Sequence, residues 1–184
     1  MKYVYIGLAI LLVVSILLII FLSKNNKLKN VLYKLSMCED EFNTALKNKE
    51  DLVLRLISII NRQLNLDLKE FTAVKNIKVD KLTLIEKDNA LTSAYDEILK
   101  IHIDHSELSE VKSFDGIMED VDKNEIELIS LRTLYNKNAT IFNSYRNKFC
   151  YKIICKFKKE NIRELFEGKE LHEVIEKELD NLVI

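Results

Sequence analysis

The chain of 184 residues contains no proline and only three glycines, Gly7, Gly116 and Gly168. Proline and glycine interrupt helices most strongly, so their near absence leaves few natural breaks. Leu, Ile, Lys, Glu and Asp are abundant instead. The composition therefore predicts an all-α fold of long helices with charged outer faces.

The chain also lacks an excess of charge and a cysteine motif. Its 28 basic and 29 acidic side chains nearly cancel, which gives no nucleic-acid footprint, so we expect no nucleic-acid partner. Cys38, Cys150 and Cys155 form no CxxC pair. We expect reduced, mostly buried thiols that neither bind zinc nor act as nucleophiles.

Catalytic motifs are missing as well. The sequence has no glycine-rich phosphate loop and no nucleophile beside a base. Its one metal-like cluster is His102, Asp104, His105 and Glu107, for which no further ligand can be identified. We expect no metal, no cofactor and no enzymatic activity.

Residues 3–22 (YVYIGLAILLVVSILLIIFL) carry no charge. At about 1.5 Å per residue, this run matches the roughly 30 Å hydrocarbon layer of a bilayer. A signal peptide would be shorter and would end in small residues, whereas bulky side chains continue here to Leu22. We therefore expect a retained transmembrane helix that contacts the lipid bilayer through residues 3–22.

Lysines give the orientation. Lys2 precedes the run, and Lys24, Lys27, Lys29 and Lys34 follow it. Basic residues near a span favour the cytoplasmic side. We expect a single-pass protein of the cell membrane with its body in the cytoplasm; the inverted arrangement is the alternative.

Apolar residues beyond the run recur at helical spacing. We expect the first helix to continue from the span, a second helix after Asp51 and a third from Leu91 to His102. The apolar positions are Leu28, Val31, Leu35, Cys38, Phe42 and Ala45 in the first; Val53, Ile57, Ile60, Leu64, Leu68, Phe71 and Val74 in the second; Leu91, Ala94, Tyr95, Ile98 and Ile101 in the third. They predict an extended antiparallel bundle of three to four helices.

A seven-residue repeat marks a fourth helix and predicts coiled-coil-like packing. It consists of Phe114, Val121, Leu128, Tyr135, Phe142 and Phe149. Three residues after each of its members, Asn124 and Asn138 interrupt an otherwise apolar row. Such asparagines either fix the register from a buried position or lie in solvent at the edge of the row.

The same region resembles the LemA family. Arg132-x-x-Tyr135-Asn136, followed by Phe142-Asn143 and Phe149, is similar to the family's R-x-x-Y-N…Y-N…F-P signature. Two upstream segments also resemble family motifs: Leu46-x-x-Lys49-x-Asp51-Leu52-Val53-x-x-Leu56-Ile57 and Phe114-x-x-Ile117-x-x-x-Val121-x-x-x-Glu125. Cys150 stands where the family has proline, His105-Ser106 replaces Tyr-Pro, and Glu39 replaces tryptophan, so the chain resembles a divergent member.

The resemblance runs from the span to about residue 167. It implies an antiparallel helical bundle on a membrane tether and supplies no catalytic residues. We divide the chain into an anchor (1–23), a LemA-like bundle (24–167) and a short amphipathic helix (168–184), which closes the bundle or binds another chain.

Two segments are candidate binding surfaces. The first is a partner-binding strip of Arg132, Tyr135, Asn136, Phe142 and Asn143, where a spacing of seven puts both aromatics on one face; the alternative is packing with local hydrogen bonds.

The second is a membrane-surface segment within residues 148–159, where lysines alternate with aromatic residues. Its candidates are Lys148, Tyr151, Lys152, Lys156, Phe157, Lys158 and Lys159. The alternative is a packed segment with solvated lysines.

The anchor and these surfaces favour a membrane-tethered scaffold or interaction protein. We expect a membrane protein as its partner, and a second copy of the chain is a further candidate. The alternative function is a lipid-sensing or membrane-shaping module that uses residues 148–159.

Overall fold

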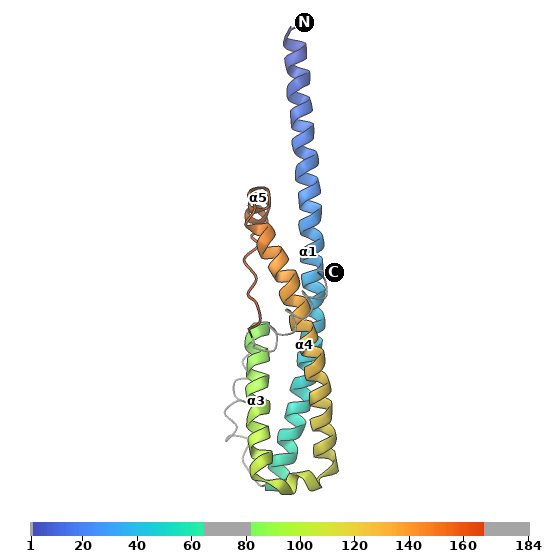
Figure 1. The fold of residues 1–184 in the computed structure, drawn as a ribbon, viewed down its shortest axis with the longest axis vertical. Helices are drawn as coiled ribbons and strands as arrows, with labels where there is room; N and C mark the ends of the chain where they lie inside the picture. Colours follow the sequence, from blue (N-terminus) through green and yellow to red (C-terminus); the bar gives the residue numbers. More distant parts are fainter. Residues whose placement is uncertain (1, 65–81, 168–184) are drawn as a thin grey trace, which may run out of the picture. The chain divides into compact units, whose positions relative to one another are not determined.

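The computed structural model describes residues 2–64 and 82–167, and nearly all of them are helical. In chain order the elements are α1 (Lys2–Leu64), α3 (Leu84–Asp104), the 3-10 helix η2 (Ser106–Glu110), α4 (Lys112–Arg146) and α5 (Phe149–Lys158) (Figure 1). The predicted all-α helical bundle is confirmed. The expected helix within 168–184 lies outside the described residues.

α1 runs without a break from the apolar run through residue 64, which confirms the predicted continuation of the first helix from the span. The predicted break near Asp51 is wrong, because residues 53–64 belong to α1. No proline or glycine interrupts this stretch, and Asp51 pairs with Arg55 at 2.7 Å across one helical turn. The rest of the expected second helix, from residue 65 onward, lies outside the described residues.

The chain divides into two compact units, and both α1 and α4 contribute residues to each. The first unit comprises Met1–Met37 and Tyr135–Leu165. In it, every residue from Tyr3 to Leu22 is exposed, and the first buried residue of α1 is Leu28. Among the described residues, α1 is the one helix long and apolar enough to cross a membrane.

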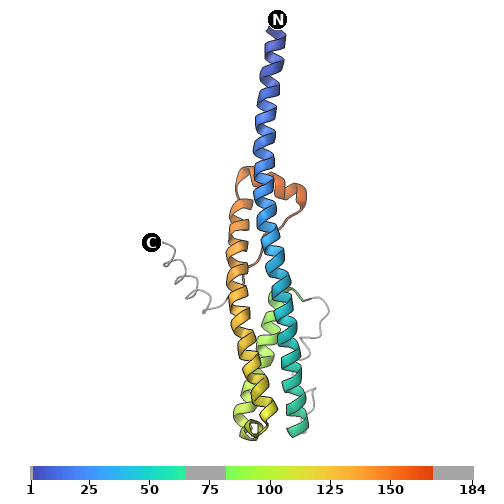
Figure 2. The ribbon, with the colours of Figure 1, turned by 90° about the vertical axis from the view of Figure 1, so that its right-hand side faces the viewer.

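The second unit comprises Cys38–Leu134 and Phe166–Ile184. There α4 lies beside α1 and α3 and runs antiparallel to both, whereas α3 runs in the direction of α1 (Figures 1 and 2). Large side chains fill the space between the helices, and the rings of Phe42 and Phe166 lie 4.7 Å apart. The fully buried ones include Phe42, Leu46, Leu56, Ile60, Leu91, Ile98 and Phe114.

The beginning of α3 is held by a capping box. The Thr83 hydroxyl accepts a hydrogen bond from the Glu86 backbone N–H at 3.3 Å, and Glu86 in return accepts one from the Thr83 N–H at 2.8 Å. These bonds satisfy donors that a helix end leaves free. They set the start of the helix that carries Asp88 and Thr92.

The seven-residue repeat of α4 is buried at Phe114, Val121, Leu128, Tyr135 and Phe142. Its predicted last member is wrong: α4 ends at Arg146, and Phe149 begins α5 with 79% of its surface exposed. Asn124 and Asn138 are both buried, which decides against the solvated reading. Asn124 Nδ2 donates to the Ala45 carbonyl oxygen on α1 at 3.2 Å.

Candidate functional site: a buried ion-pair network

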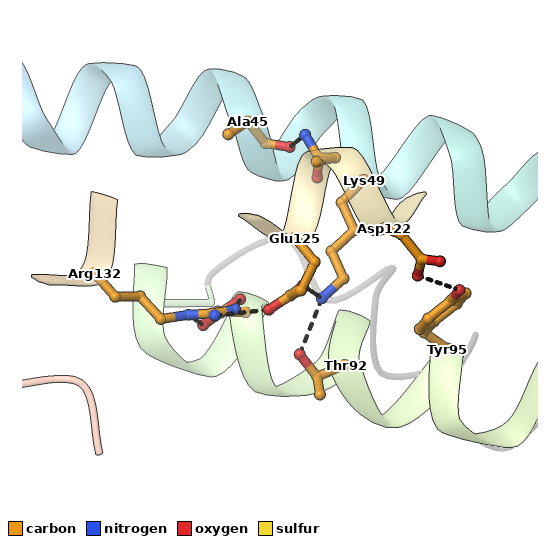
Figure 3. A network of polar contacts seen from close by, with 9 residues as sticks. Ala45, Lys49, Thr92, Tyr95, Asp122, Glu125 and Arg132 are labelled. Atoms are coloured by element: carbon orange, nitrogen blue, oxygen red, sulfur yellow. Dashed lines mark hydrogen bonds and ion pairs between the residues drawn. The ribbon is translucent and has the colours of Figure 1, made fainter. Parts of the chain in front are cut away.

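The most concentrated chemistry of the second unit begins at Lys49 on α1. This lysine is only 1% exposed, although burying an ammonium group without partners is very costly. Its Nζ donates to Glu125 Oε2 of α4 at 2.5 Å and to Thr92 Oγ1 of α3 at 3.1 Å (Figure 3). One side chain thus connects three helices.

Arg132 on α4 extends the network. Its guanidinium holds Asp88 of α3 through two hydrogen bonds of 2.7 Å, from Nε to Oδ2 and from Nη2 to Oδ1. Its Nη1 donates to Glu125 Oε1, also at 2.7 Å. Two such parallel bonds give Arg–carboxylate pairs both strength and a defined geometry. Lys49, Asp88, Glu125 and Arg132 form the four-charge network, in which two positive and two negative charges cancel.

Helical spacing explains why these residues meet. Glu125 and Arg132 are seven residues apart, so they lie on one face of α4 two turns from each other. Asp88 and Thr92 are four apart and lie on one face of α3. A further contact joins these two helices, where the Tyr95 hydroxyl donates to Asp122 Oδ1 at 3.1 Å.

The network shifts the pKa values of Glu125 and Arg132. Burial disfavours the charged form of Glu125, but hydrogen bonds and charge from Lys49 and Arg132 outweigh it and hold the pKa of Glu125 below its ordinary value. Burial likewise opposes the charge of Arg132, and Asp88 and Glu125 outweigh it and raise the pKa of Arg132. Outside the network, burial and then the Asp122 charge raise the pKa of Tyr95. The shifts of Glu125 and Arg132 both favour the charged form of the side chain.

The arrangement is suited to holding helices in register. Each oxygen of Glu125 accepts from a different cation, and both oxygens of Asp88 accept from Arg132. A shift of any one helix by a turn would leave a buried charge unpaired. Chemically, the network positions α1, α3 and α4 against one another.

The candidate partner-binding strip is largely engaged within the chain. Tyr135, Asn136 and Phe142 are buried, and Arg132 belongs to the four-charge network. Asn143 Nδ2 donates to the Arg163 carbonyl oxygen at 2.8 Å, and Asn143 Oδ1 accepts from the Arg163 N–H at 3.0 Å. Binding of a partner by this strip stays a prediction.

The candidate membrane-surface segment forms α5. Tyr151 is buried in the first unit, whereas the remaining candidates are exposed. These exposed residues are Lys148, Lys152, Lys156, Phe157, Lys158 and Lys159.

The histidines considered as metal ligands have other neighbours. The His102 ring lies 5.2 Å from that of Phe114, and His105 Nδ1 lies 3.2 Å from Glu107 Oε1. Over residues 2–64 and 82–167, no group of three or more His, Cys, Asp or Glu side chains could hold a metal ion.

Sequence reasoning missed the network as a site. Lys49 and Glu125 were considered only as members of two separate motifs, and Arg132 only as a member of a third motif and of the partner-binding strip. Asp88 and Thr92 were not singled out at all. The available signal was polar residues at helical spacing within apolar stripes: Lys49 lies between Leu46 and Val53, and Asp88 lies three residues before Leu91.

Replacing Arg132 by methionine should lower the free energy of unfolding by about 3–5 kcal/mol, because Asp88 would stay buried without its cation. The matched control is Arg55→Met, which removes an exposed pair on α1 and should cost less than about 1 kcal/mol. Urea unfolding of the full chain in mild detergent, followed by circular dichroism, measures both. Equal losses in the two variants would contradict the assigned role of the network.

The pKa of Glu125 also predicts a pH dependence. Because this pKa is lower in the folded chain, the stabilisation by Glu125 is fully present above its unfolded pKa of about 4.3 and is lost as the pH falls through the folded value. Glu125→Gln should therefore unfold more easily at neutral pH but lose less additional stability below about pH 4. Urea midpoints between neutral and acidic pH test this, and parallel curves for both proteins would refute it.

The comparisons with known proteins agree with the motifs that meet in this network. The LemA family model matches residues 38–177, which is well over half of the chain. A search of curated proteins finds no match. The matched region includes all four members of the network, from Lys49 to Arg132. The chain belongs to the LemA family.

Proposed function

We propose that this LemA-family chain is a single-pass membrane protein whose helical body binds other membrane proteins as a scaffold and performs no catalysis. The observation that carries the proposal is the use of the motif residues Lys49, Glu125 and Arg132. Glu125 accepts hydrogen bonds from both Lys49 and Arg132 inside the bundle, so the charged groups of these motif residues have a structural role.

The membrane anchor is supported by the exposure of the apolar run. Large side chains such as Ile16 and Phe21 keep 49% and 46% of their surface exposed, whereas Leu28 on the same helix is fully buried. An apolar helix of this length matches the thickness of the hydrocarbon layer of a bilayer. The lysines after the run favour a cytoplasmic body.

Scaffolding is supported by the pairing of buried charge and by the tether itself. The four-charge network gives the helices of the second unit a defined arrangement, and a defined surface is what a partner recognises. A tether restricts that partner to the same membrane, where the effective concentration of a second membrane protein is high. A second copy of the chain is the other candidate partner.

A charge placed in the apolar run should release the chain from membranes. A lysine at the centre of a spanning helix costs about 2.5–3.5 kcal/mol for insertion, so Leu12→Lys combined with Ile16→Lys should move the chain from the carbonate-resistant membrane pellet to the supernatant. The matched control, Ile126→Lys, changes an apolar side chain that is 70% exposed on α4 and should stay in the pellet. A double variant that remains in the pellet would contradict the anchor.

The scaffold is tested by proximity labelling from the carboxyl end in intact cells. We expect the same membrane proteins to be labelled in repeated experiments by the wild type and by Ile126→Lys, and these labels to be lost with Leu12→Lys and Ile16→Lys. Labelling that follows bulk protein abundance in all three chains would contradict a scaffold. Predominant labelling of the chain itself would identify a second copy as the partner.

A further inference from the structure

Helix α5 has one face on the protein and an apolar stripe directed away from it. Tyr151, Ile154 and Cys155 are buried in the first unit. Phe149, Ile153 and Phe157 are 79%, 42% and 82% exposed. These three residues are four apart and therefore share one side of the helix, which we call the α5 stripe.

The surroundings of the α5 stripe are strongly basic. Residues 148–159 contain five lysines and no acidic residue. Lys152 and Lys156 directly precede Ile153 and Phe157 in sequence, and both are exposed. Exposed aromatic side chains beside lysines are typical of helices that lie in the interface of an anionic bilayer.

The position of α5 within the first unit is given by Tyr151. Lys24 Nζ lies 5.5 Å from the centre of the Tyr151 ring, and Lys24 is the second residue after the apolar run ends at Leu22. The Tyr151 ring also stacks on Tyr145 at the end of α4, with centroids 4.8 Å apart. Figure 2 shows α5 running across α1, and Figure 1 looks nearly along α5. Helix α5 therefore lies close to the point where α1 leaves its apolar run.

The segment after α5 is hydrogen-bonded to side chains of α4. Arg146 Nε donates to the Glu160 carbonyl oxygen at 3.2 Å, and Asn143 makes its two bonds to the Arg163 backbone. Lys159 ends α5 in the left-handed conformation. Contacts on both sides of α5 thus hold it in place while its stripe stays uncovered.

We propose that α5 binds the headgroup region of the bilayer that holds α1, with the α5 stripe inserted and the lysines on anionic lipid phosphates. This inference rests on the proposed spanning of the membrane by α1. A span fixes the depth of Lys24, and its contact with Tyr151 brings α5 to the same depth. Phe149 and Phe157 then reach the acyl boundary, and the lysines extend to the phosphates.

A second copy of the chain is a poorer occupant. In a symmetric dimer the same patch faces itself, so the five lysines of one α5 would approach the five of the other. Like charges at an interface oppose association. Anionic lipid has the complementary charge and is supplied by the membrane in which the anchor lies.

The test uses the native thiols of the full chain. Cys150 is exposed beside Phe149, whereas Cys38 and Cys155 are buried, so an environment-sensitive fluorophore can be attached at Cys150. The labelled chain is reconstituted into vesicles of phosphatidylcholine, with or without phosphatidylglycerol, that contain lipids with a nitroxide quencher just below the headgroup. We expect strong quenching that increases with phosphatidylglycerol.

Two variants separate the apolar and the charged contributions. Phe149→Ser with Phe157→Ser should abolish quenching in both lipids. Lys152→Gln with Lys156→Gln should weaken docking about fivefold per lysine in the anionic vesicles and much less in phosphatidylcholine. The matched controls Ile126→Ser and Lys123→Gln change exposed residues of α4 and should leave quenching unchanged.

Failure of the inference differs from failure of the anchor. If the chain does not float with vesicles at all, the proposal that α1 spans the membrane is wrong, and the proposed docking of α5 is overturned as well. If the chain floats but the fluorophore is not quenched, the anchor stands and the docking of α5 is overturned. Energy transfer between fluorophores on different chains, without quenching by lipid, would overturn the proposal and show that a second copy of the chain binds the α5 stripe.

Discussion

The second unit depends on the pairing of four charges between its helices. The side chains of Lys49 and Asp88 are buried, and those of Arg132 and Glu125 are 12% and 30% exposed. Removing an ammonium, a guanidinium and two carboxylates from water costs several kcal/mol for each ion, and this cost is offset only when every charge meets its partner. Lys49, Asp88, Glu125 and Arg132 come from three helices, so they pair completely only when α1, α3 and α4 are all in place. Apolar packing alone tolerates sliding by a turn, because one leucine can replace another. The four-charge network therefore makes one arrangement preferable to its neighbours.

Features that depend on local pattern were predictable from the sequence. The apolar run and the buried repeat from Phe114 to Phe142 follow from periodicity, and the family motifs pointed to the bundle. The continuation of α1 past Asp51 was missed because the apolar residues after Asp51 were assigned to a second helix, although no helix breaker is present and Arg55 pairs with Asp51 across one turn. Phe149 was misplaced because the repeat continues in the sequence after the helix has ended at Arg146.

The four-charge network could not be predicted, since it depends on distances between helices that no spacing specifies. Asp88 is a buried carboxylate whose partner lies 44 residues away. In sequence it looks like any polar residue on a solvated face. Conversely, Asn143 was predicted to lie in a partner-binding strip, and its two hydrogen bonds to the Arg163 backbone became visible only with the fold.

Charged residues on the same helix thus differ in their burial and in their partners. On α1, Lys24 lies over a tyrosine ring close to the end of the apolar run, whereas Lys49 is fully enclosed and pairs with Glu125. On α4, Lys123 forms exposed pairs with Glu119 and Asp120, whereas Arg132, with 12% of its side chain exposed, pairs with Asp88 and Glu125. Burial, more than residue type, determines how much each charge contributes to the structure.

A double-mutant cycle on Lys49 and Glu125 tests the central claim most directly. Lys49→Met, Glu125→Gln and the double variant are compared by urea unfolding with the matched exposed cycle of Lys123→Met and Glu119→Gln. We expect a coupling energy above about 1 kcal/mol for the Lys49–Glu125 pair and below about 0.5 kcal/mol for the exposed Lys123–Glu119 pair. Coupling energies that are equally small for the two pairs would contradict it.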